Sequence, residues 1–400
     1  MDRNWKKNYF IILTGQGISS FTSAVLQMAM VWYLTEYTKS AFVLTMSTLI
    51  GFLPRVVLGP FIGVFIDRHD RKRIMIFSDC FIAVVSLLLV FAGHDGKVPV
   101  WIIMLVMLIR SVGAAFHAPA IQAVTPMLVP KKELARYAGI SQGVESVSML
   151  LSPGVAAFLF SFWTVSELVW LDVAGVIVAV FTIYLVRIPD MQSMPEQKHL
   201  WQETKAGFAA IKRVPGLWSV IIISGLYAII YFPIGTLFPH ISMNYFQGSF
   251  RMSGVVETVF SIGMLLGAAI LGAWGNHLRK DRAISFSIGL YGVGLFITGF
   301  LPEEGLYIFV VLCLFMGISI PFYRGVKMAF IQEKVEEEYM GRVLSLTNSL
   351  QSLTMPIGLI VAGNLVDRVG VNRFFGVLGL CSIILMAVSQ LLPSFRKAGE

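Results

Sequence analysis

Residues 41–73 read AFVLTMSTLIGFLPRVVLGPFIGVFIDRHDRKR. The first 26 of these residues contain one charge, Arg55, whereas the last seven contain six. A helix needs about 20 apolar residues to cross the hydrocarbon core of a bilayer, so this run is long enough. The charge cluster marks the point at which the chain returns to water. The stretch therefore predicts a membrane-spanning helix that ends in a polar turn.

Runs of similar length and composition fill the chain. They fall near residues 9–34, 41–66, 74–93, 98–122, 137–162, 168–187, 218–239, 252–275, 283–301, 306–330, 342–366 and 374–393. The chain is 56% hydrophobic and 14% charged, whereas a soluble domain is about one-quarter charged. The runs lack the alternation over about ten residues that is typical of membrane β-barrels. The sequence predicts an all-α polytopic membrane protein with twelve transmembrane helices.

Lys and Arg residues are distributed unevenly over the two sides of the predicted membrane. The two termini and the loops on their side carry 23 of the 31, and the opposite loops carry five. By the positive-inside rule, both termini are cytoplasmic. This distribution accounts for the net charge of +8 without a nucleic-acid partner. Cys80, Cys313 and Cys381 lie inside apolar runs, and their spacing indicates neither disulfides nor a metal site.

One long cytoplasmic loop divides the helices into two sets of six. We expect an N-terminal half over residues 1–187, a linker over 188–217 and a C-terminal half over 218–400. In the linker, Trp201, Phe208 and Ile211 recur at helical spacing. This pattern is typical of an amphipathic helix on the membrane surface.

The two halves resemble each other in sequence. GAAFHAP, which ends at Pro119, corresponds to GISIP, which ends at Pro321, and Ser152-Pro153 corresponds to Met355-Pro356. The offsets between the prolines are 202 and 203 residues. Two parallel six-helix repeats predict a transporter that works by alternating access. The chain has no phosphate-binding loop of the nucleoside triphosphatases, so we expect no nucleotide-binding domain within it and transport driven by an ion gradient or downhill.

The turn after the second apolar run carries a motif. It resembles G-x-x-x-D-R-x-G-R-[KR]-[KR], the signature of the major facilitator superfamily, with Asp70 in place of the second glycine. The matching residues are Gly63, Asp67, Arg68, Arg71, Lys72 and Arg73. The family pattern implies a gate in which Asp67 docks at the start of the eleventh helix, near Glu338 and Arg342, when the cytoplasmic side is closed. A helix N-terminus favours such an anion.

Two further stretches resemble motifs of this superfamily. The fourth run contains IRSVGAA, a partial match to R-x-x-x-G that begins at Arg110. The fifth run contains a degenerate form of the antiporter motif G-x-x-x-G-P-x-x-G-G, carried by Ser148, Ser152, Pro153 and Ala157. Small residues at such positions allow helices to approach closely.

Nearly the whole chain resembles the macrolide-efflux proteins of the superfamily, through stretches such as IRSVGAAFHAPAIQAVTPMLVP. This resemblance implies a drug:proton antiporter in the bacterial inner membrane that exports macrolides or other amphipathic drugs. It implies no enzymatic activity, cofactor or metal. The expected partners are the drug, protons and the lipid bilayer.

Charged residues inside the apolar runs are candidate functional sites because a charge in hydrocarbon costs roughly 2.5 to 3.5 kcal/mol on insertion scales. Arg55, Arg110 and Glu145 are expected near mid-membrane, with Arg110 and Glu145 at the same depth on consecutive helices. We expect these two to pair and to couple transport to protons, with His117 as a relay because an imidazole titrates at about pH 6.5. Four further charges are expected near the surfaces, within reach of water: Asp79, Asp172, Glu257 and Arg324.

A large amphipathic substrate needs aromatic, methionine and amide side chains in its cavity. The sequence places these among the apolar runs at Gln16, Gln27, Tyr227, Tyr231, Tyr323, Asn348, Gln351 and Met355. Two alternatives stay open. A transporter of the same fold could instead import or export a small metabolite, and a membrane-embedded transferase would need a cluster of metal ligands that the six scattered histidines do not form.

Overall fold

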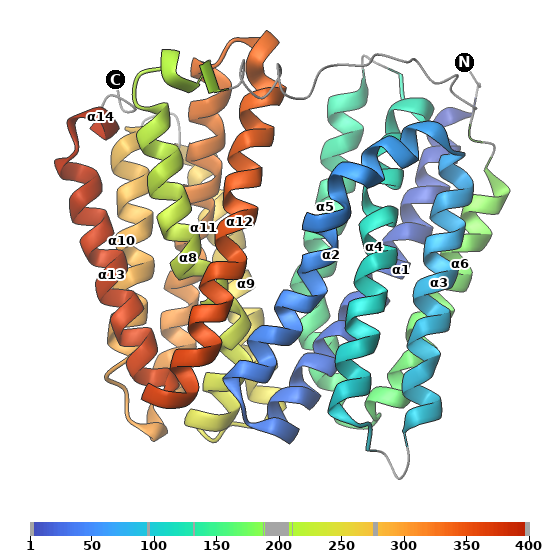
Figure 1. Cartoon of the computed structure of the whole chain (residues 1–400), viewed down its shortest axis with the longest axis horizontal. Coiled ribbons are helices and arrows are strands. Elements are labelled where there is room, and N and C mark those ends of the chain that lie inside the picture. The colour runs from blue at the N-terminus through green and yellow to red at the C-terminus, as the bar shows by residue number, and fades with distance from the viewer. Residues whose placement is uncertain are drawn as a thin grey trace. The chain divides into compact units, whose positions relative to one another are not determined.

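The computed structural model describes residues 4–93, 97–130, 133–186, 188, 208–209, 211–274 and 279–396. Most of the expected linker, including Trp201, lies outside these residues, so its surface helix stays a prediction. The chain forms two compact units (Figure 1). Unit 1 comprises residues Met1–Tyr37 and Ser47–Pro195, and unit 2 comprises Thr38–Met46 and Glu196–Glu400.

In the described residues of the first part of the chain there are six long helices. They are α1 (Trp5–Thr38), α2 (Ala41–Arg68), α3 (Arg71–Ala92), α4 (Val100–Leu128), α5 (Leu134–Leu159) and α6 (Val165–Leu185). The first six residues of α2 group with unit 2, and the remainder of this helix belongs to unit 1. Helix α2 is therefore shared by the two units.

Within its described residues, the second part of the chain forms six more long helices and three short ones. They are α8 (Leu217–His240), the π-helix η2 (Ile241–Tyr245), α9 (Phe250–Trp274), α10 (Lys280–Thr298), the 3-10 helix η4 (Glu303–Gly305), α11 (Leu306–Lys334), α12 (Glu337–Val369), α13 (Val371–Leu391) and α14 (Pro393–Arg396). The expected prolines Pro153, Pro321 and Pro356 all lie inside long helices.

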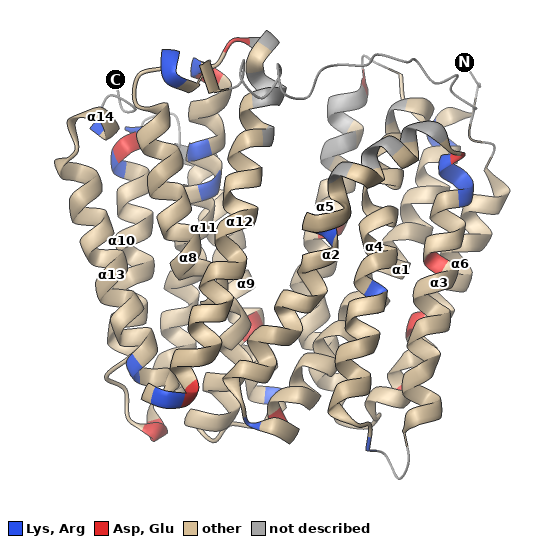
Figure 2. Cartoon of the chain, in the orientation of Figure 1, with Lys and Arg blue, Asp and Glu red and all other residues tan. Residues whose placement is uncertain are grey.

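The twelve long helices coincide with the twelve apolar runs, which confirms the predicted fold class. Ten of them are long and apolar enough by themselves to cross a membrane. The two others are more polar: α5 carries Glu145 and several serines, and α10 begins with Lys280, Asp281 and Arg282. Figure 2 shows that the charges of the described residues gather toward the helix ends and are sparse between them.

Large apolar side chains point outward from both units. Phe91 is 83% exposed, Tyr184 is 77% exposed and Leu391 is 74% exposed. A water-soluble protein rarely exposes contiguous apolar surface on this scale. The exposed side chains are those that hydrocarbon would cover, as the composition predicts for a multi-pass membrane protein.

Small residues let neighbouring helices pack closely. A Cβ atom at Gly317 of α11 would lie 3.0 Å from the carbonyl carbon of Phe260 in α9, and one at Gly263 of α9 would lie 3.1 Å from Cα of Gly317. On the other side of unit 2, a Cβ atom at Gly379 of α13 would lie 2.6 Å from Cα of Phe296 in α10. Van der Waals contact between backbones at such positions is a main source of helix association in membranes.

Candidate transport and coupling sites

A buried ion pair joins two helices of unit 1. Nη1 of Arg110 in α4 lies 2.5 Å from Oδ2 of Asp172 in α6, and the two side chains are 7% and 0% exposed. Arg110 also donates to Ser86 of α3, and Ser23 of α1 donates to Oδ1 of Asp172 at 2.6 Å. Four helices thus satisfy the two charges, as a pair removed from water requires.

This pairing corrects two expectations from the sequence. Asp172, expected within reach of water, is fully buried, and Arg110 pairs with it rather than with Glu145. The reason lies in helix direction. Side chains on a helix lean toward its N-terminus, and α4 and α5 run in opposite directions in the expected topology. Arg110 and Glu145 therefore lean toward opposite sides of the membrane, although they start at the same depth.

A second buried polar cluster lies in unit 1. Oδ1 of Asp79 in α3 is 3.2 Å from Nε2 of His117 in α4, with side chains 4% and 15% exposed. Gln16 of α1 donates to Oδ2 of Asp79 at 3.3 Å. Asp79 was expected near water, and its burial corrects that expectation. The contact is an ion pair only when His117 is protonated, so it links the charge of the carboxylate to the protonation of the imidazole.

Glu145 is placed differently from the buried acids. It is exposed, accepts a hydrogen bond of 3.4 Å from Gln142 one turn earlier in α5, and interacts electrostatically with Arg55 of α2. An exposed carboxylate that attracts a distant arginine can bind a cationic solute at a lower cost than a buried one. The sequence places Arg55 and Glu145 near mid-membrane but does not indicate that they interact.

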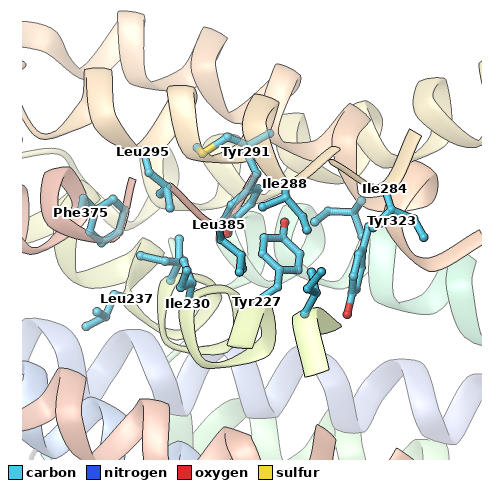
Figure 3. Close-up of a cluster of buried hydrophobic side chains, with 14 of the residues drawn as sticks. Tyr227, Ile230, Leu237, Ile284, Ile288, Tyr291, Leu295, Tyr323, Phe375 and Leu385 are labelled. Atoms are coloured by element: carbon cyan, nitrogen blue, oxygen red, sulfur yellow. The ribbon is translucent and has the colours of Figure 1, made fainter. Parts of the chain in front are cut away.

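Three tyrosines meet in the interior of unit 2. The ring of Tyr227 in α8 lies 4.7 Å from that of Tyr323 in α11 and 5.9 Å from that of Tyr291 in α10, each in an edge-to-face arrangement (Figure 3). Tyr231 extends the cluster at 6.1 Å from Tyr227. Tyr227 and Tyr291 are fully buried. In this structure Tyr227 therefore packs the core of unit 2 rather than lining an open surface.

The margin of this tyrosine cluster carries polar and cationic groups. Gln351 of α12 donates to the hydroxyl of Tyr323 at 3.1 Å, and that hydroxyl donates to the carbonyl of Ser224 at 3.3 Å. Arg324 lies over the ring of Tyr231 at 5.5 Å, and Lys327 lies over that of Tyr323 at 5.0 Å. The structure thus brings together Tyr227, Tyr231, Tyr323 and Gln351 of the expected cavity residues.

The remaining expected cavity residues lie on two helices, α1 and α12. Gln16 is buried with Asp79, as described above, and Gln27 is half-buried in α1. On α12, Asn348 is exposed and Met355 is half-buried. These positions leave Gln27, Asn348 and Met355 accessible, so their assignment to a substrate cavity stays a proposal.

The signature turn between α2 and α3 is described in part. The surroundings of Gly63 and the side chains of Asp67, Arg68, Glu338 and Arg342 lie outside what the structure describes, so the expected gate stays a prediction. Asp70, which replaces the motif glycine, is the N-cap of α3 and accepts from the backbone amides of Lys72 and Arg73 at 2.8 and 3.3 Å. The turn is thus built by a capping carboxylate, with φ of −62° at Asp70, rather than by a glycine.

Two of the motif cations hold the turn against neighbouring segments. Lys72 donates to the carbonyl oxygens of Tyr184 and Val186 at the end of α6, at 3.3 and 2.7 Å. Arg71 lies 3.0 Å from the sulfur of Met127 in α4. Cations at a helix C-terminus complement its dipole, which is the role Lys72 has at α6.

The antiporter-like motif lies in α5. Ser148 and Ser152 donate to carbonyl oxygens three or four residues earlier, at 3.0 and 3.4 Å. Both serines, Pro153 and Ala157 are buried. The motif therefore lies on a packed face of α5, where small residues allow close contact.

An apolar cavity of about 490 Å³ opens beside the signature turn. Its lining includes Phe65, Phe77, Phe81 and Phe116, with His69, Asp70 and Arg73 also among the residues that surround it. Apolar walls with a few polar groups suit an amphipathic molecule.

Comparison with known proteins agrees with this architecture. The sequence model described as Major Facilitator Superfamily matches residues 12–358 and 226–398. The chain belongs to the major facilitator superfamily. A structural relative, a bacterial homologue of the iron transporter ferroportin, superposes over 100% of both chains with a TM-score of 0.74 and 15% sequence identity. At that identity the likeness concerns the superfamily fold alone.

Two relatives within the superfamily are much closer in sequence. The chain is 45% identical over 396 residues to Macrolide efflux protein A of Streptococcus pyogenes, which covers 98% of each sequence. It is also 45% identical over 322 residues to Macrolide efflux protein A of Enterococcus faecalis, which covers 80% of this chain and 99% of that protein. The chain is thus a superfamily transporter similar to macrolide-efflux proteins.

Proposed function

We propose that this chain exports macrolides or similar amphipathic drugs across the bacterial plasma membrane in exchange for protons, by alternating access. The 45% identity to two proteins named Macrolide efflux protein A supports the substrate class and the direction. The observation that supports proton coupling is the contact of 3.2 Å between Asp79 and His117 inside unit 1.

The proton site in this proposal is the cluster of Asp79, His117 and Gln16. A buried carboxylate is costly unless it is paired or protonated. In this proposal, Asp79 binds a proton when neither His117 nor water reaches its carboxylate. A change in the exposure of Asp79 during transport would then load or release the proton. His117 thus keeps the relay role expected from the sequence, with Asp79 rather than Glu145 as its partner.

Glu145 has a separate role in this proposal. Macrolides generally carry an amine that is cationic at neutral pH, and a cationic drug needs a carboxylate that it can reach. Glu145 is exposed and already interacts with a cation, Arg55. We propose that the drug amine replaces Arg55 as the cation that Glu145 attracts.

Accumulation of labelled erythromycin tests the proposal directly. Cells that contain the protein should accumulate less label than cells without it, and a protonophore should abolish the difference. Equal accumulation in the two strains would contradict macrolide export and would favour a small metabolite as substrate. A difference that survives collapse of the proton gradient would contradict proton coupling alone.

A further inference from the structure

The signature sequence occurs a second time, at the end of α12. Residues 363–370 read GNLVDRVG, so Gly363, Asp367 and Arg368 repeat Gly63, Asp67 and Arg68 at an offset of 300 residues. The two halves of the chain are related by an offset of about 202 residues. The second copy therefore does not arise from simple duplication of the halves and calls for its own explanation.

In this second copy the turn is built as the family pattern describes. Gly370, between α12 and α13, has φ of +90°. This is a conformation that residues other than glycine rarely adopt. At the equivalent position the first copy has Asp70. The glycine of the motif turn is thus present at the end of α12 and absent at the end of α2.

Asp367 binds the start of α2. Its Oδ1 accepts from the backbone amide of Ala41 at 2.8 Å, and its Oδ2 accepts from Ser40 Oγ at 2.7 Å and from the amide of Phe42 at 3.2 Å. The first amides of a helix have no partner within that helix. A carboxylate there satisfies them and complements the helix dipole. Asp367 therefore caps α2 from another helix.

Gly363 permits this contact. A Cβ atom at Gly363 would overlap Oγ1 of Thr45 and would lie 3.3 Å from Cα of Phe42. Thr45 is fully buried and donates to the carbonyl of Ala41 at 2.9 Å. Any larger residue at Gly363 would push the first turn of α2 away from α12. The glycine and the aspartate of the motif thus act on the same turn of α2.

We propose that Gly363 and Asp367 form a latch that holds the first turn of α2 on α12 while the extracellular side is closed, and releases it when that side opens. The positive-inside rule places this end of α12 outside the cell. The motif at the other end of α2, Gly63 and Asp67, is the expected cytoplasmic gate at the start of α12. The proposal rests on alternating access but not on the identity of the drug.

Cysteine labelling tests the latch without any substrate. In a background with Cys80, Cys313 and Cys381 replaced by serine, Ala41→Cys places a thiol at a fully buried position beside Asp367. We expect an impermeant maleimide added to intact cells to label it slowly. Asp367→Asn should increase that rate about tenfold, the change that corresponds to loss of one charge-assisted hydrogen bond.

Two further variants separate the latch from a general loss of structure. Gly363→Ala should also accelerate labelling, and Gly363→Ala with Thr45→Ala should slow it again because the overlapping hydroxyl is gone. Glu36→Gln, a matched loss of one exposed carboxylate charge near the end of α1, should leave the rate unchanged.

The latch is contradicted if Asp367→Asn labels at the parental rate. It is also contradicted if the thiol reacts only in inverted vesicles. A labelling change without macrolide export would leave the latch standing and would reject only the proposed substrate.

Discussion

Arg110 and Asp172 are the closest buried opposite charges described in unit 1, with 2.5 Å between Nη1 and Oδ2 and an exposure of 0% for the Asp172 side chain. Breaking such a pair leaves an uncompensated charge, which costs roughly 3 to 5 kcal/mol. We expect Arg110→Ala to lower the thermal unfolding temperature in detergent strongly and to lower export with it.

A matched double variant distinguishes a loss of stability from a direct role of Arg110 in transport. Arg110→Ala with Asp172→Ala removes both charges and should regain most of the stability. Arg73→Gln, at an exposed pair whose arginine side chain is 88% accessible, should change the unfolding temperature little. If Arg110→Ala were as stable as the parent protein but inactive, Arg110 would be part of the coupling machinery after all.

Asp79→Asn and His117→Gln should uncouple transport from the proton gradient. Each variant keeps the approximate size of the side chain and removes one titrating group of the buried pair. We expect drug binding within about threefold of the parent, because such neutral replacements keep part of the hydrogen bonding. Efflux against a gradient should be lost, measured in vesicles with an imposed pH difference. Normal uphill transport by both variants would remove this cluster from the coupling mechanism.

Glu145→Gln should weaken binding of cationic macrolides while leaving the proton dependence of the residual transport intact. Loss of one exposed ion pair, worth up to about 1 kcal/mol, predicts an increase in KM of up to roughly fivefold. An uncharged macrolide analogue is the control, and its KM should not change. If uphill efflux disappeared with KM unchanged, Glu145 would carry the proton, as the sequence alone suggested.

The cytoplasmic placement of the basic loops can be checked by topology mapping. In the background without native cysteines, Arg213→Cys in the linker and Arg279→Cys before α10 should react only after permeabilisation. Lys97→Cys in the loop before α4 should react in intact cells. The reason is that the termini and the loops on their side carry 23 Lys and Arg residues, whereas the opposite loops carry five. Loops rich in Lys and Arg stay in the cytoplasm. Labelling of the linker from outside would reverse the topology.

The sequence by itself determined the number, length and type of the helices, because the bilayer imposes a fixed length of apolar chain and requires each segment to satisfy its own backbone. Predicted and observed limits differ by no more than six residues at either end of each helix, as for the run at 41–66 and α2 at Ala41–Arg68. The motif at Asp67 was recognisable for a similar reason, since a charge cluster after an apolar run is a local pattern.

Only the tertiary structure decided which charges meet. Depth along a helix is a one-dimensional quantity, and it placed Arg110 beside Glu145. The actual partner depends on the rotation of each helix about its axis and on the direction in which its side chains lean. These features brought Asp172 to Arg110 and Asp79 to His117. The capping of α2 by Asp367 joins residues more than 320 positions apart, so no local pattern could reveal it, although the repeated G-x-x-x-D-R was present in the sequence.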